Sequence, residues 1–582
     1  CQSRFCRFRT GTGEKRARSR DRLRKIYNFS RVIVAKLATR KTSYQGDEML
    51  TVLASVFDKT GLVELLKALS EVEQVKVIAT GSTCGYLREH GFDGVKVEDM
   101  TGFPEILDGR VKTLHPRVFA GVLARASEAD RATLKEHNIS EIDVVVVNLY
   151  PFAEKMKLGL KLSELIEFID IGGPSLLRAG SKNYDRVAVL SSPSQYQAFA
   201  EAVKAGKADK AYRLQLAAAV FAQTKEYDGL IEQVLSAAAR GEEAESAHFP
   251  AAVSLSLKQV STLRYGENPH QAAAWYQPPR LAEGLEADSF PPFEQLAGKE
   301  LSANNIVDCY ALVRILRDIR KATSSAAEAA CIIKHNNPCG VAIGKTTEEA
   351  FDRAYGTDPL SAFGGIYGFS GNVDGALAAK IVQGFVEIVA APSFSEEALK
   401  TFASKKNMRV LKLKAGLLGE ANTASAEASP IRIKDMGDFG LILEKDVEKP
   451  VSVAEFETAC GDGKLAVSLK DDLAFAWNVV KHLTSNAIVV VKDGNAVGFG
   501  IGQTSRVASV KLALAQGGAL CQGAIMASDA FFPNVDSIEE AAAHGIKVII
   551  QPGGSIKDKD VIAKAQELGV TMLLTGQRCF RH

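Results

Sequence analysis

The sequence predicts an α/β protein of more than one domain. The chain has 582 residues, which is more than a single hydrophobic core usually serves. From residue 50 onward, short β-branched runs alternate with amphipathic segments of helical periodicity. One run, Ile142–Leu149, is apolar without alternation, as expected of a parallel strand buried on both faces. These patterns favour a doubly wound sheet in the first part of the chain.

The N-terminal domain is predicted over residues 49–245. Asp58 is expected to cap the helix that runs through Leu62 and Leu69. The small, charged segment Gly241–Pro250 ends in proline and predicts a linker. Strands are expected at Leu50–Val56, Val75–Ala79, Ile142–Leu149 and Val187–Leu190, and helices from Gly81 through Leu87 and over Ala211–Ala239.

The C-terminal region, residues 250–582, has its own set of strands. It also contains a faint internal echo: Lys334-His335 precedes the strand Val341–Gly344, and Lys481-His482 precedes Ala487–Val491. The echo suggests two similar half-domains. A surface loop is expected at Ala421–Pro430, and further strands at Cys331–Lys334, Gly365–Phe369, Ile388–Ala391, Ala524–Ala527, Val548–Ile550 and Met572–Leu574.

The first forty residues are strongly basic. They contain ten Arg, three Lys and two acidic residues, a net charge of +11, so the rest of the chain carries about −9 of the total +2. An Arg-rich, acid-poor start is typical of an organelle transit peptide. Residues 1–48 are therefore predicted to be a leader that directs the protein to an organelle, the chloroplast first, with the mitochondrion or the cytosol as alternatives. The competing interpretation is an unstructured basic tail or a translation artefact.

Several protein classes are disfavoured by composition and spacing. No apolar run approaches the roughly 20 residues of a membrane span, and the acidic body argues against nucleic-acid binding. The nine Cys and nine His lack ligand spacing, so neither a disulfide framework nor a metal site is expected. A Walker A loop ending at Gly344-Lys345-Thr346 would need Gly where Cys339 stands, and Gly498-x-Gly500-x-Gly502 lacks the third glycine of a dinucleotide motif.

A first candidate site follows the early strands. Hydroxyl and glycine residues stand where each strand meets a helix, around Ser55–Gly61 and Thr80–Thr83. Such turns bind anions through free N–H groups and the helix dipole, although most are only caps. Further polar segments are Gly109–Pro116, Asn148–Phe152, Ile169–Gly173 and Leu177–Asn183.

In order and spacing, these segments resemble the inosine monophosphate cyclohydrolase domain, which implies a methylglyoxal-synthase-like α/β fold. Ring closure needs proton removal, oxyanion stabilisation and protonation of a leaving hydroxyl. By resemblance, Lys112, Tyr150, Asp170 and Lys182 are assigned to catalysis, with Lys182 first for proton transfer and Asp170 pairing with it or with the substrate amide. Phe57 and Phe119 stand where the family usually has Ser and His. The nucleotide-binding set implied by the resemblance is Ser55, Val56, Lys59, Thr80, Gly81, Ser82, Thr83, Arg110, Thr113 and Asn148.

A second candidate site is spread over the C-terminal region. Lys334-His335 precedes a polar Asn-Asn-Pro turn, where a buried strand would deliver side chains to a cleft. The accompanying segments are Arg264–Gln271, Asp358–Gly365, Ser485-Asn486, Gly502–Arg506, Ser528–Pro533, Gln551–Ser555 and Gln577–His582. This set resembles aminoimidazole carboxamide ribonucleotide transformylase in its bacterial and plant-like form. The resemblance implies two cytidine-deaminase-like halves and a bifunctional purine-biosynthesis family, and it covers the chain from about residue 50 to the end.

The resemblance also implies a chemistry for the second site. His335 is the expected base or proton shuttle, since its ordinary pKa lies closest to neutrality. Lys334 is expected to stabilise the oxyanion, and Asn486 to orient the reactants. The co-substrate is 10-formyltetrahydrofolate, no metal is required, and a homodimer is implied because the family places this site between two subunits. Expected nucleotide-binding residues are Arg264, Tyr265, Gly364, Glu387, Arg506, Phe531, Arg578 and His582, and expected folate-binding residues are Phe363, Val507, Asp536, Ser555 and Ile556.

The alternative to a bifunctional enzyme is a nucleotide-binding regulator. In that interpretation the hydroxyl-rich turns are helix caps and the Lys-His pair lies on the surface. This interpretation accounts for each motif taken singly. It does not explain two independent sets of residues in the order of one family.

Overall fold

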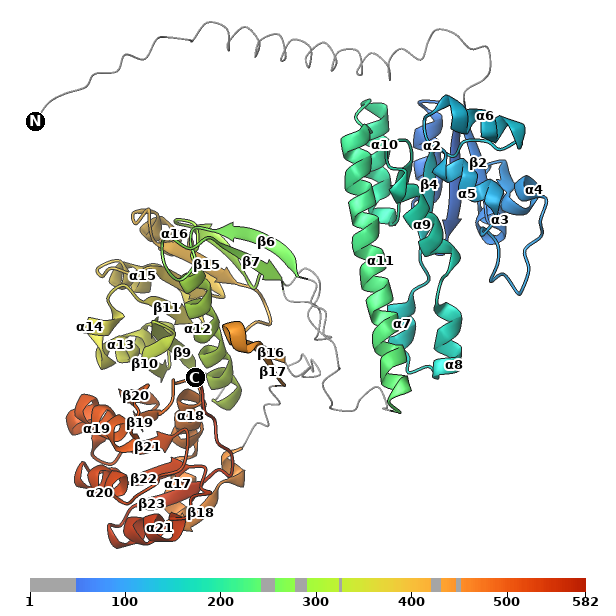
Figure 1. The fold of residues 1–582 in the computed structure, drawn as a ribbon. Helices are drawn as coiled ribbons and strands as arrows, with labels where there is room; N and C mark the ends of the chain where they lie inside the picture. The colour runs from blue at the N-terminus through green and yellow to red at the C-terminus, as the bar shows by residue number, and fades with distance from the viewer. Residues whose placement is uncertain (1–48, 242–256, 278–289, 324–326, 420–430, 446–451) are drawn as a thin grey trace, which may run out of the picture. The chain divides into compact units, whose positions relative to one another are not determined.

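The computed structural model describes residues 49–241, 257–277, 290–323, 327–419, 431–445 and 452–582 (Figure 1). The chain forms two units, one on each side of the Ser254–Leu255 bond. The predicted leader 1–48, the Ala421–Pro430 loop and most of the Gly241–Pro250 linker lie outside the described residues. No described helix is long and apolar enough to cross a bilayer.

The N-terminal unit is built on a parallel five-stranded sheet. Its strands are β1 (Leu50–Val56), β2 (Val75–Ala79), β3 (Gly94–Lys96), β4 (Val144–Asn148) and β5 (Ala188–Leu190), in the order β3-β2-β1-β4-β5. Every residue of β4 is buried, as the unbroken apolar run predicts. One face packs against α2 (Leu62–Ser70), α3 (Gly81–Glu89) and α10 (Tyr196–Lys204). The other packs against α4 (Val97–Thr101), α5 (Pro116–Leu123) and α9 (Gly172–Lys182), so the doubly wound prediction is confirmed.

The longest helix, α11 (Lys210–Ala239), runs beside this sheet and continues past it to α7 (Phe152–Lys157) and α8 (Leu162–Leu165) (Figure 1). The expected Asp58 cap on α2 is wrong. The helix begins after Gly61, whose φ of 71° is left-handed, while the Asp58 carboxylate accepts the Thr60 N–H at 2.9 Å. Asp58 therefore closes a turn ahead of the helix. The remaining α-helix in the described part of this unit is α6 (Glu128–Glu136).

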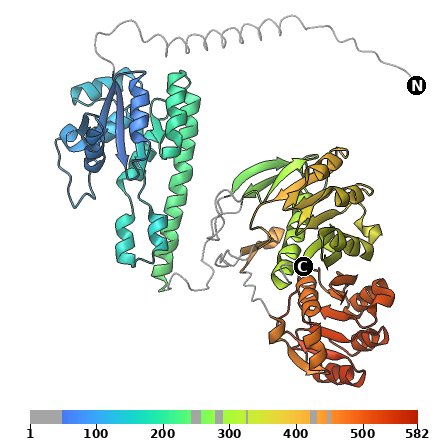
Figure 2. The ribbon, with the colours of Figure 1, turned by 180° about the vertical axis from the view of Figure 1, so that it is seen from behind.

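The C-terminal unit contains one twelve-stranded mixed sheet (Figures 1 and 2). In spatial order its strands are β18 (Glu457–Cys460), β23 (Thr571–Leu574), β22 (Val548–Gln551), β21 (Ile525–Ser528), β19 (Ile488–Lys492), β20 (Asn495–Gly500), β10 (Asn337–Gly344), β9 (Glu328–Lys334), β11 (Ile366–Phe369), β13 (Ile388–Ala391), β15 (Arg409–Leu413) and β8 (Phe293–Ala297). The strands predicted for this region are all present, with small shifts at their ends.

This sheet consists of two equivalent halves that meet where β10 pairs with β20. Outward from that junction, each half shows two antiparallel pairings, then two parallel pairings, then an antiparallel one. One sheet face packs against α12 (Ala303–Ala322) and α18 (Lys470–Val480). The opposite face is covered by α13 (Thr347–Thr357), α15 (Gly375–Ile381) and α16 (Glu396–Ala403) in one half, and by α19 (Arg506–Gly517), α20 (Asp536–Ala543) and α21 (Asp558–Glu567) in the other. The expectation of two halves is confirmed, whereas their likeness to cytidine deaminases stays a prediction.

Smaller elements complete the unit. They are the hairpins β6 (Lys258–Leu263)–β7 (Ala273–Gln277) and β16 (Ile431–Asp435)–β17 (Leu441–Lys445), the pair β12 (Asn372–Val373)–β14 (Ser393–Phe394), and the short helices α14 (Pro359–Ala362) and α17 (Gly463–Ser468).

The internal repeat is present, but the sequence comparison paired Lys334 with the wrong lysine, Lys481. Lys334 ends β9 and pairs with Asn337 across a two-residue turn, and Lys492 ends β19 and pairs with Asn495 across another. Lys481 instead follows α18. The structural counterpart of Lys334 is therefore Lys492, and the counterpart of the His335-Asn336 turn is Asp493-Gly494.

Close packing explains the misleading glycine motif. A Cβ on Gly500 would lie 1.8 Å from the Ser509 carbonyl oxygen, and a Cβ on Gly498 would lie 2.1 Å from that of Ala513. These glycines let α19 lie directly on β20, and they do not form a dinucleotide loop.

A buried ion-pairing cluster joins α12 to the end of α18. Asp318 accepts a hydrogen bond from His482 at 2.6 Å and from Lys481 at 2.8 Å. Complete burial lowers the pKa of His482 despite the neighbouring carboxylate. His482 is therefore neutral at pH 7 and donates one N–H to Asp318.

The stability of the C-terminal unit should fall on mild acidification. The unfolded chain binds a proton at His482 below about pH 6.5 while the folded chain does not, so the unfolding free energy falls by up to about 1.4 kcal/mol per pH unit. Denaturant unfolding between pH 5 and 7 should show a shallower pH slope for His482→Gln than for wild type. His544→Gln, at a half-exposed histidine, is the control. Equal slopes in all three proteins would contradict the assignment.

Candidate active sites

The first site begins at the carboxyl ends of β1 and β2. The Thr80 hydroxyl lies 3.5 Å from that of Ser55 and 3.4 Å from that of Thr83. Thr83 also accepts the Val56 N–H at 3.3 Å, which ties the end of β1 to the start of α3. Because α3 begins at Gly81, its free N–H groups lie next to these hydroxyls. This arrangement suits a phosphate, and Gly81 and Ser82 are at its centre.

Lys112, Thr113 and Asp170 come together on the neighbouring loops. Thr113 Oγ1 would lie 3.0 Å from a Cβ on Gly172, so it reaches the start of α9. Burial raises the pKa of Asp170, against the lowering effects of the Gly173 and Gly172 N–H groups and the charge of Lys112. The Asp170 carboxylate accepts the Gly173 N–H at 2.8 Å. Asp170 is thus a partly desolvated carboxylate at the positive end of a helix.

Two residues that the sequence reasoning missed support this group. Glu105 pairs with Lys112, with 3.1 Å between Oε1 and Nζ. Tyr227 on α11 accepts the Asp170 N–H at 2.7 Å and donates its hydroxyl to the Phe168 carbonyl at 2.9 Å. A tyrosine inside a long helical run carries no motif, so its contact with Asp170 could not be recognised from sequence.

Asn148 shapes the turn after β1. Its Oδ1 accepts the N–H groups of Phe57 and Asp58 at 2.6 and 2.9 Å, and its Nδ2 donates to the Asp58 carbonyl at 2.6 Å. Lys59 Nζ lies 3.4 Å from the Phe57 carbonyl. The Phe57 ring packs edge-on against Tyr150 with 5.5 Å between centroids. The unusual Phe57 therefore contacts a candidate catalytic residue directly, whereas Phe119 packs against the core.

Two expected residues lie apart from this group or are otherwise engaged. Lys182 is the last residue of α9 and Asp170 precedes the first, so about 16 Å of helix separates them. The expected pairing of Lys182 with Asp170 is therefore absent within one chain, because the two residues occupy opposite helix ends. Arg110 forms an exposed ion pair with Glu167.

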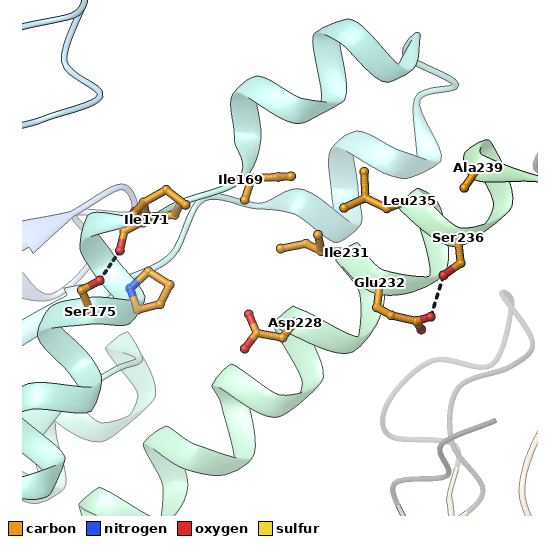
Figure 3. Close-up of a pocket in the computed structure, with 11 residues that line it drawn as sticks. Ile169, Ile171, Ser175, Asp228, Ile231, Glu232, Leu235, Ser236 and Ala239 are labelled. Atoms are coloured by element: carbon orange, nitrogen blue, oxygen red, sulfur yellow. Dashed lines mark hydrogen bonds between the residues drawn. The ribbon is translucent and has the colours of Figure 1, made fainter. Parts of the chain in front are cut away.

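Two hollows flank the group. One, of about 720 Å³, is lined by Lys59, Asn148, Tyr150 and Tyr227, among others. The other, of about 650 Å³, lies between the segment around Asp170 and the C-terminal half of α11 (Figure 3). Apolar side chains such as Ile231 dominate this second hollow, and its charged residues are acidic: Asp170, Asp228 and Glu232. A phosphate would therefore not be favoured there.

The second site occupies one edge of the twelve-stranded sheet. Lys334 ends β9, and its antiparallel neighbour β11 begins at that edge, just after Gly364. The β10–β20 register places Asn337 level with Gly500. Asn486 precedes β19, and Phe531 and Ser555 follow β21 and β22. Strand direction therefore brings both halves of the unit to the same edge.

Lys334 is held against the segment before β11. Its Nζ donates to the Phe363 carbonyl, and a Cβ on Gly364 would lie 3.3 Å from Nζ, so glycine leaves room for the amine. Glu387 accepts a hydrogen bond from Asn305 at 3.0 Å and lies 3.9 Å from Arg409. The missed residues Asn305 and Arg409 therefore hold the expected ligand Glu387.

Asn486 is fixed by a buried network. Arg506 Nη2 donates to its Oδ1 at 2.7 Å, and its own Nδ2 donates to the Gln503 carbonyl at 2.7 Å. Arg506 also pairs with Asp529, which is fully buried. Arg506 is only 5 % exposed, and within the chain it holds Asn486; its expected role as a nucleotide ligand stays a prediction.

The other expected ligands lie on surface segments of this unit. Arg264 donates to the Tyr265 hydroxyl at 2.8 Å, and the Arg578 guanidinium lies over the Phe580 ring at 4.6 Å. Phe580 in turn lies 5.5 Å from the His582 ring. Phe363 and Ile556 are exposed, as binding of a flat aromatic ligand would require. Val507 and Asp536 lie in the first turns of α19 and α20.

Two separate candidate sites, one at a strand–helix edge suited to an anion and one at a Lys-His turn, indicate an enzyme with two active centres. Residues 61–175 match the MGS-like domain, and residues 180–516 match the family described as the AICARFT/IMPCHase bienzyme. The chain is 44% identical over 535 residues to "Bifunctional purine biosynthesis protein PurH" of Bacillus subtilis, covering 91% of this chain and 99% of that protein. The protein of that name from Synechococcus elongatus is 44% identical over 534 residues, covering 91% and 99% of the two chains.

The chain therefore belongs to the AICARFT/IMPCHase bienzyme family. The family resemblance seen in the motifs is confirmed, as is the methylglyoxal-synthase-like character of the N-terminal fold. Metal binding finds no support among the described residues, where no cluster of His, Cys, Asp or Glu could hold an ion.

Replacing Asn148 should loosen the first site. Asn148→Ala removes three hydrogen bonds to the Phe57–Asp58 turn and should cost about 2–3 kcal/mol of unfolding free energy. Asn148→Asp keeps the hydrogen-bond acceptor and loses the donor, so the unfolding free energy should fall by less than in Asn148→Ala. Chemical denaturation of the three proteins measures this order, and Ser194→Ala on the surface is the control. An alanine variant as stable as wild type would contradict the role of Asn148 in the turn.

Proposed function

We propose that the chain catalyses the last two steps of inosine monophosphate synthesis. The first is formyl transfer from 10-formyltetrahydrofolate to 5-aminoimidazole-4-carboxamide ribonucleotide, and the second is dehydrative ring closure. The observation that carries this proposal is that Lys334, His335 and Asn486, from different halves of one sheet, share a single sheet edge. Family membership supports the same pair of activities. The cyclohydrolase is assigned to residues 49–245 and the transformylase to residues 250–582.

In formyl transfer, the substrate amine attacks the formyl carbon, and the folate nitrogen leaves with a proton. His335 accepts the proton from the attacking amine. Lys334, directed by its bond to the Phe363 carbonyl, stabilises the tetrahedral oxyanion. Asn486 orients the reactants, and the Arg506–Asp529 pair keeps its amide in place.

In ring closure, the carboxamide nitrogen attacks the formamide carbon and water leaves. Asp170 is suited to remove the nitrogen proton because it is partly desolvated, and Lys112 lies close enough to stabilise the developing oxyanion. Tyr150 lies beside the turn that follows β1. The phosphate is assigned to Ser55, Thr80, Gly81, Ser82 and Thr83, at the start of α3.

Several finer assignments accompany the proposal. A homodimer is inferred from the family, which places the transformylase site between two subunits. Residues 1–48 are inferred to be a transit peptide for the chloroplast, with the mitochondrion or the cytosol as alternatives, because of their basic, acid-poor composition. Neither reaction is assigned a metal, because lysine and histidine supply the cation and the proton carrier.

The two reactions should be separable by single substitutions. Lys334→Ala should abolish formyl transfer and leave ring closure intact, whereas Lys492→Ala, at the equivalent position of the other half, should leave both unchanged. Lys112→Ala should abolish ring closure and spare formyl transfer. Lys182 lies at the other end of α9 from Asp170, so Lys182→Ala tests whether the residue that the resemblance puts first for proton transfer acts in ring closure at all. Both steps are assayed on purified folded protein, with and without 10-formyltetrahydrofolate. Loss of both activities from one of these substitutions would contradict the two-site assignment, and an active Lys182→Ala would remove Lys182 from the catalytic set.

The rate of ring closure should fall on acidification, and the fall should occur at a pH above the pKa of an ordinary carboxyl group. Burial raises the pKa of Asp170, so the ionised base is lost as pH falls through a value above about 4. The pH profile of kcat/KM for cyclisation, measured in the Lys334→Ala background, tests this. Asp170→Asn should be inactive at every pH. A profile that is flat down to pH 4 would show that Asp170 is not the base.

A further inference from the structure

The turn that carries His335 has an uncommon backbone. His335 and Asn336 have φ values of 52° and 64°, both left-handed. A two-residue hairpin of this kind favours Asn-Gly or Asp-Gly because each central residue needs a positive φ. The equivalent turn in the other half has that sequence, Asp493-Gly494, with φ values of 51° and 69°. The same fold position thus carries an easily formed turn in one half and a less favourable one in the other.

Both turns are held by a carboxylate from the neighbouring helix. Asp472 on α18 accepts the N–H groups of Asp493 and Gly494 at 2.8 and 2.7 Å. Asp308 on α12 accepts the Asn336 N–H at 2.6 Å. Burial raises the pKa of Asp308, and Lys334 and His335 lie near enough to oppose that shift. The contact is therefore repeated in both halves, but only Asp308 lies beside a candidate catalytic pair.

The first turn has an additional partner from the end of the chain. Arg581 Nη2 donates to the Asn336 side-chain oxygen at 2.9 Å, and Nη1 donates to the His482 carbonyl. The Arg581 backbone is itself fixed, because its carbonyl accepts the Ser485 N–H at 2.9 Å. Arg581 therefore connects the His335 turn to the segment that leads into Asn486.

We propose that Asp308 and Arg581 are positioning residues that hold the His335-Asn336 turn in the conformation required for formyl transfer. The inference rests on the proposed function. The direction of the His335 Cα–Cβ bond follows from the backbone of the turn, so a turn that relaxes to negative φ points the imidazole in another direction. Asp308, on α12, fixes the backbone of the turn. Arg581 fixes the Asn336 side chain and the distance between the turn and Asn486.

Steady-state kinetics of formyl transfer on the full-length protein test the proposal. Asp308→Ala and Arg581→Met should each lower kcat about 100-fold, with little change in KM for the nucleotide. Asp308→Asn keeps the acceptor and Arg581→Lys keeps a donor, so both should recover much of kcat. Ring closure, measured on the same samples, should stay at the wild-type rate and reports that the protein is folded.

Matched variants separate positioning from general destabilisation. Asp472→Ala removes the equivalent contact in the other half and should leave kcat unchanged. Arg578→Met, three residues before Arg581, should mainly raise KM for the nucleotide. The proposal is overturned if Asp472→Ala lowers kcat as much as Asp308→Ala, or if Arg581→Met retains wild-type kcat. An Asp308→Asn variant as inactive as Asp308→Ala would also overturn it, since the carboxylate would then act in proton transfer. Absence of formyl transfer in the wild-type protein would instead refute the proposed function.

Discussion

The pairing of β10 with β20 is the constraint on which the C-terminal unit depends. It joins two half-sheets of equivalent topology into one sheet, and the buried Asp318–His482 pair fastens the helices that cover the junction. Because β10 and β20 are antiparallel, the end of β9 and the start of β19 lie at the same edge of the sheet. Lys334 and Asn486 therefore lie at one edge, although they come from different halves. A change in the β10–β20 register would separate them before any individual side chain was altered.

The two active centres use different physical means. In the N-terminal candidate site, parallel strands deliver hydroxyls and helix N-termini to one edge, an arrangement whose dipoles suit an anion. The C-terminal site relies on side chains fixed by buried charge pairs, above all Arg506 with Asp529. In each site, a candidate residue is held in place by a neighbouring side chain. Tyr227 serves Asp170 in this way, and Arg506 serves Asn486.

Sequence reasoning recovered the elements whose burial leaves a local pattern. Leu50–Val56 is rich in apolar residues, and β4 belongs to an unbroken apolar run, a pattern that specifies central parallel strands. The supporting residues were missed because their partners are far away in sequence: Asp308 reaches a turn 28 residues later, and Arg581 binds Asn336 across 245 residues. The internal repeat is real, but its sequence alignment is wrong. The dipeptide Lys-His recurs at Lys481, whereas the structural equivalent of Lys334 is Lys492. The Asp58 cap failed because Asn148, 90 residues away, fixes the turn that Asp58 occupies.

The difference between the two hairpin turns has a consequence for how the unit assembles. Asp493-Gly494 is a sequence that closes a hairpin locally, on the microsecond scale of such events. Both turns have a carboxylate partner on the neighbouring helix, but His335-Asn336 lacks the favourable turn sequence and has a further partner, Arg581, from the last residues of the chain. The β19–β20 hairpin is thus fitted to begin folding, and the β9–β10 hairpin is completed late. The two equivalent halves thus carry different turns at one position: a sequence that folds readily in one half, and the candidate catalytic histidine in the other.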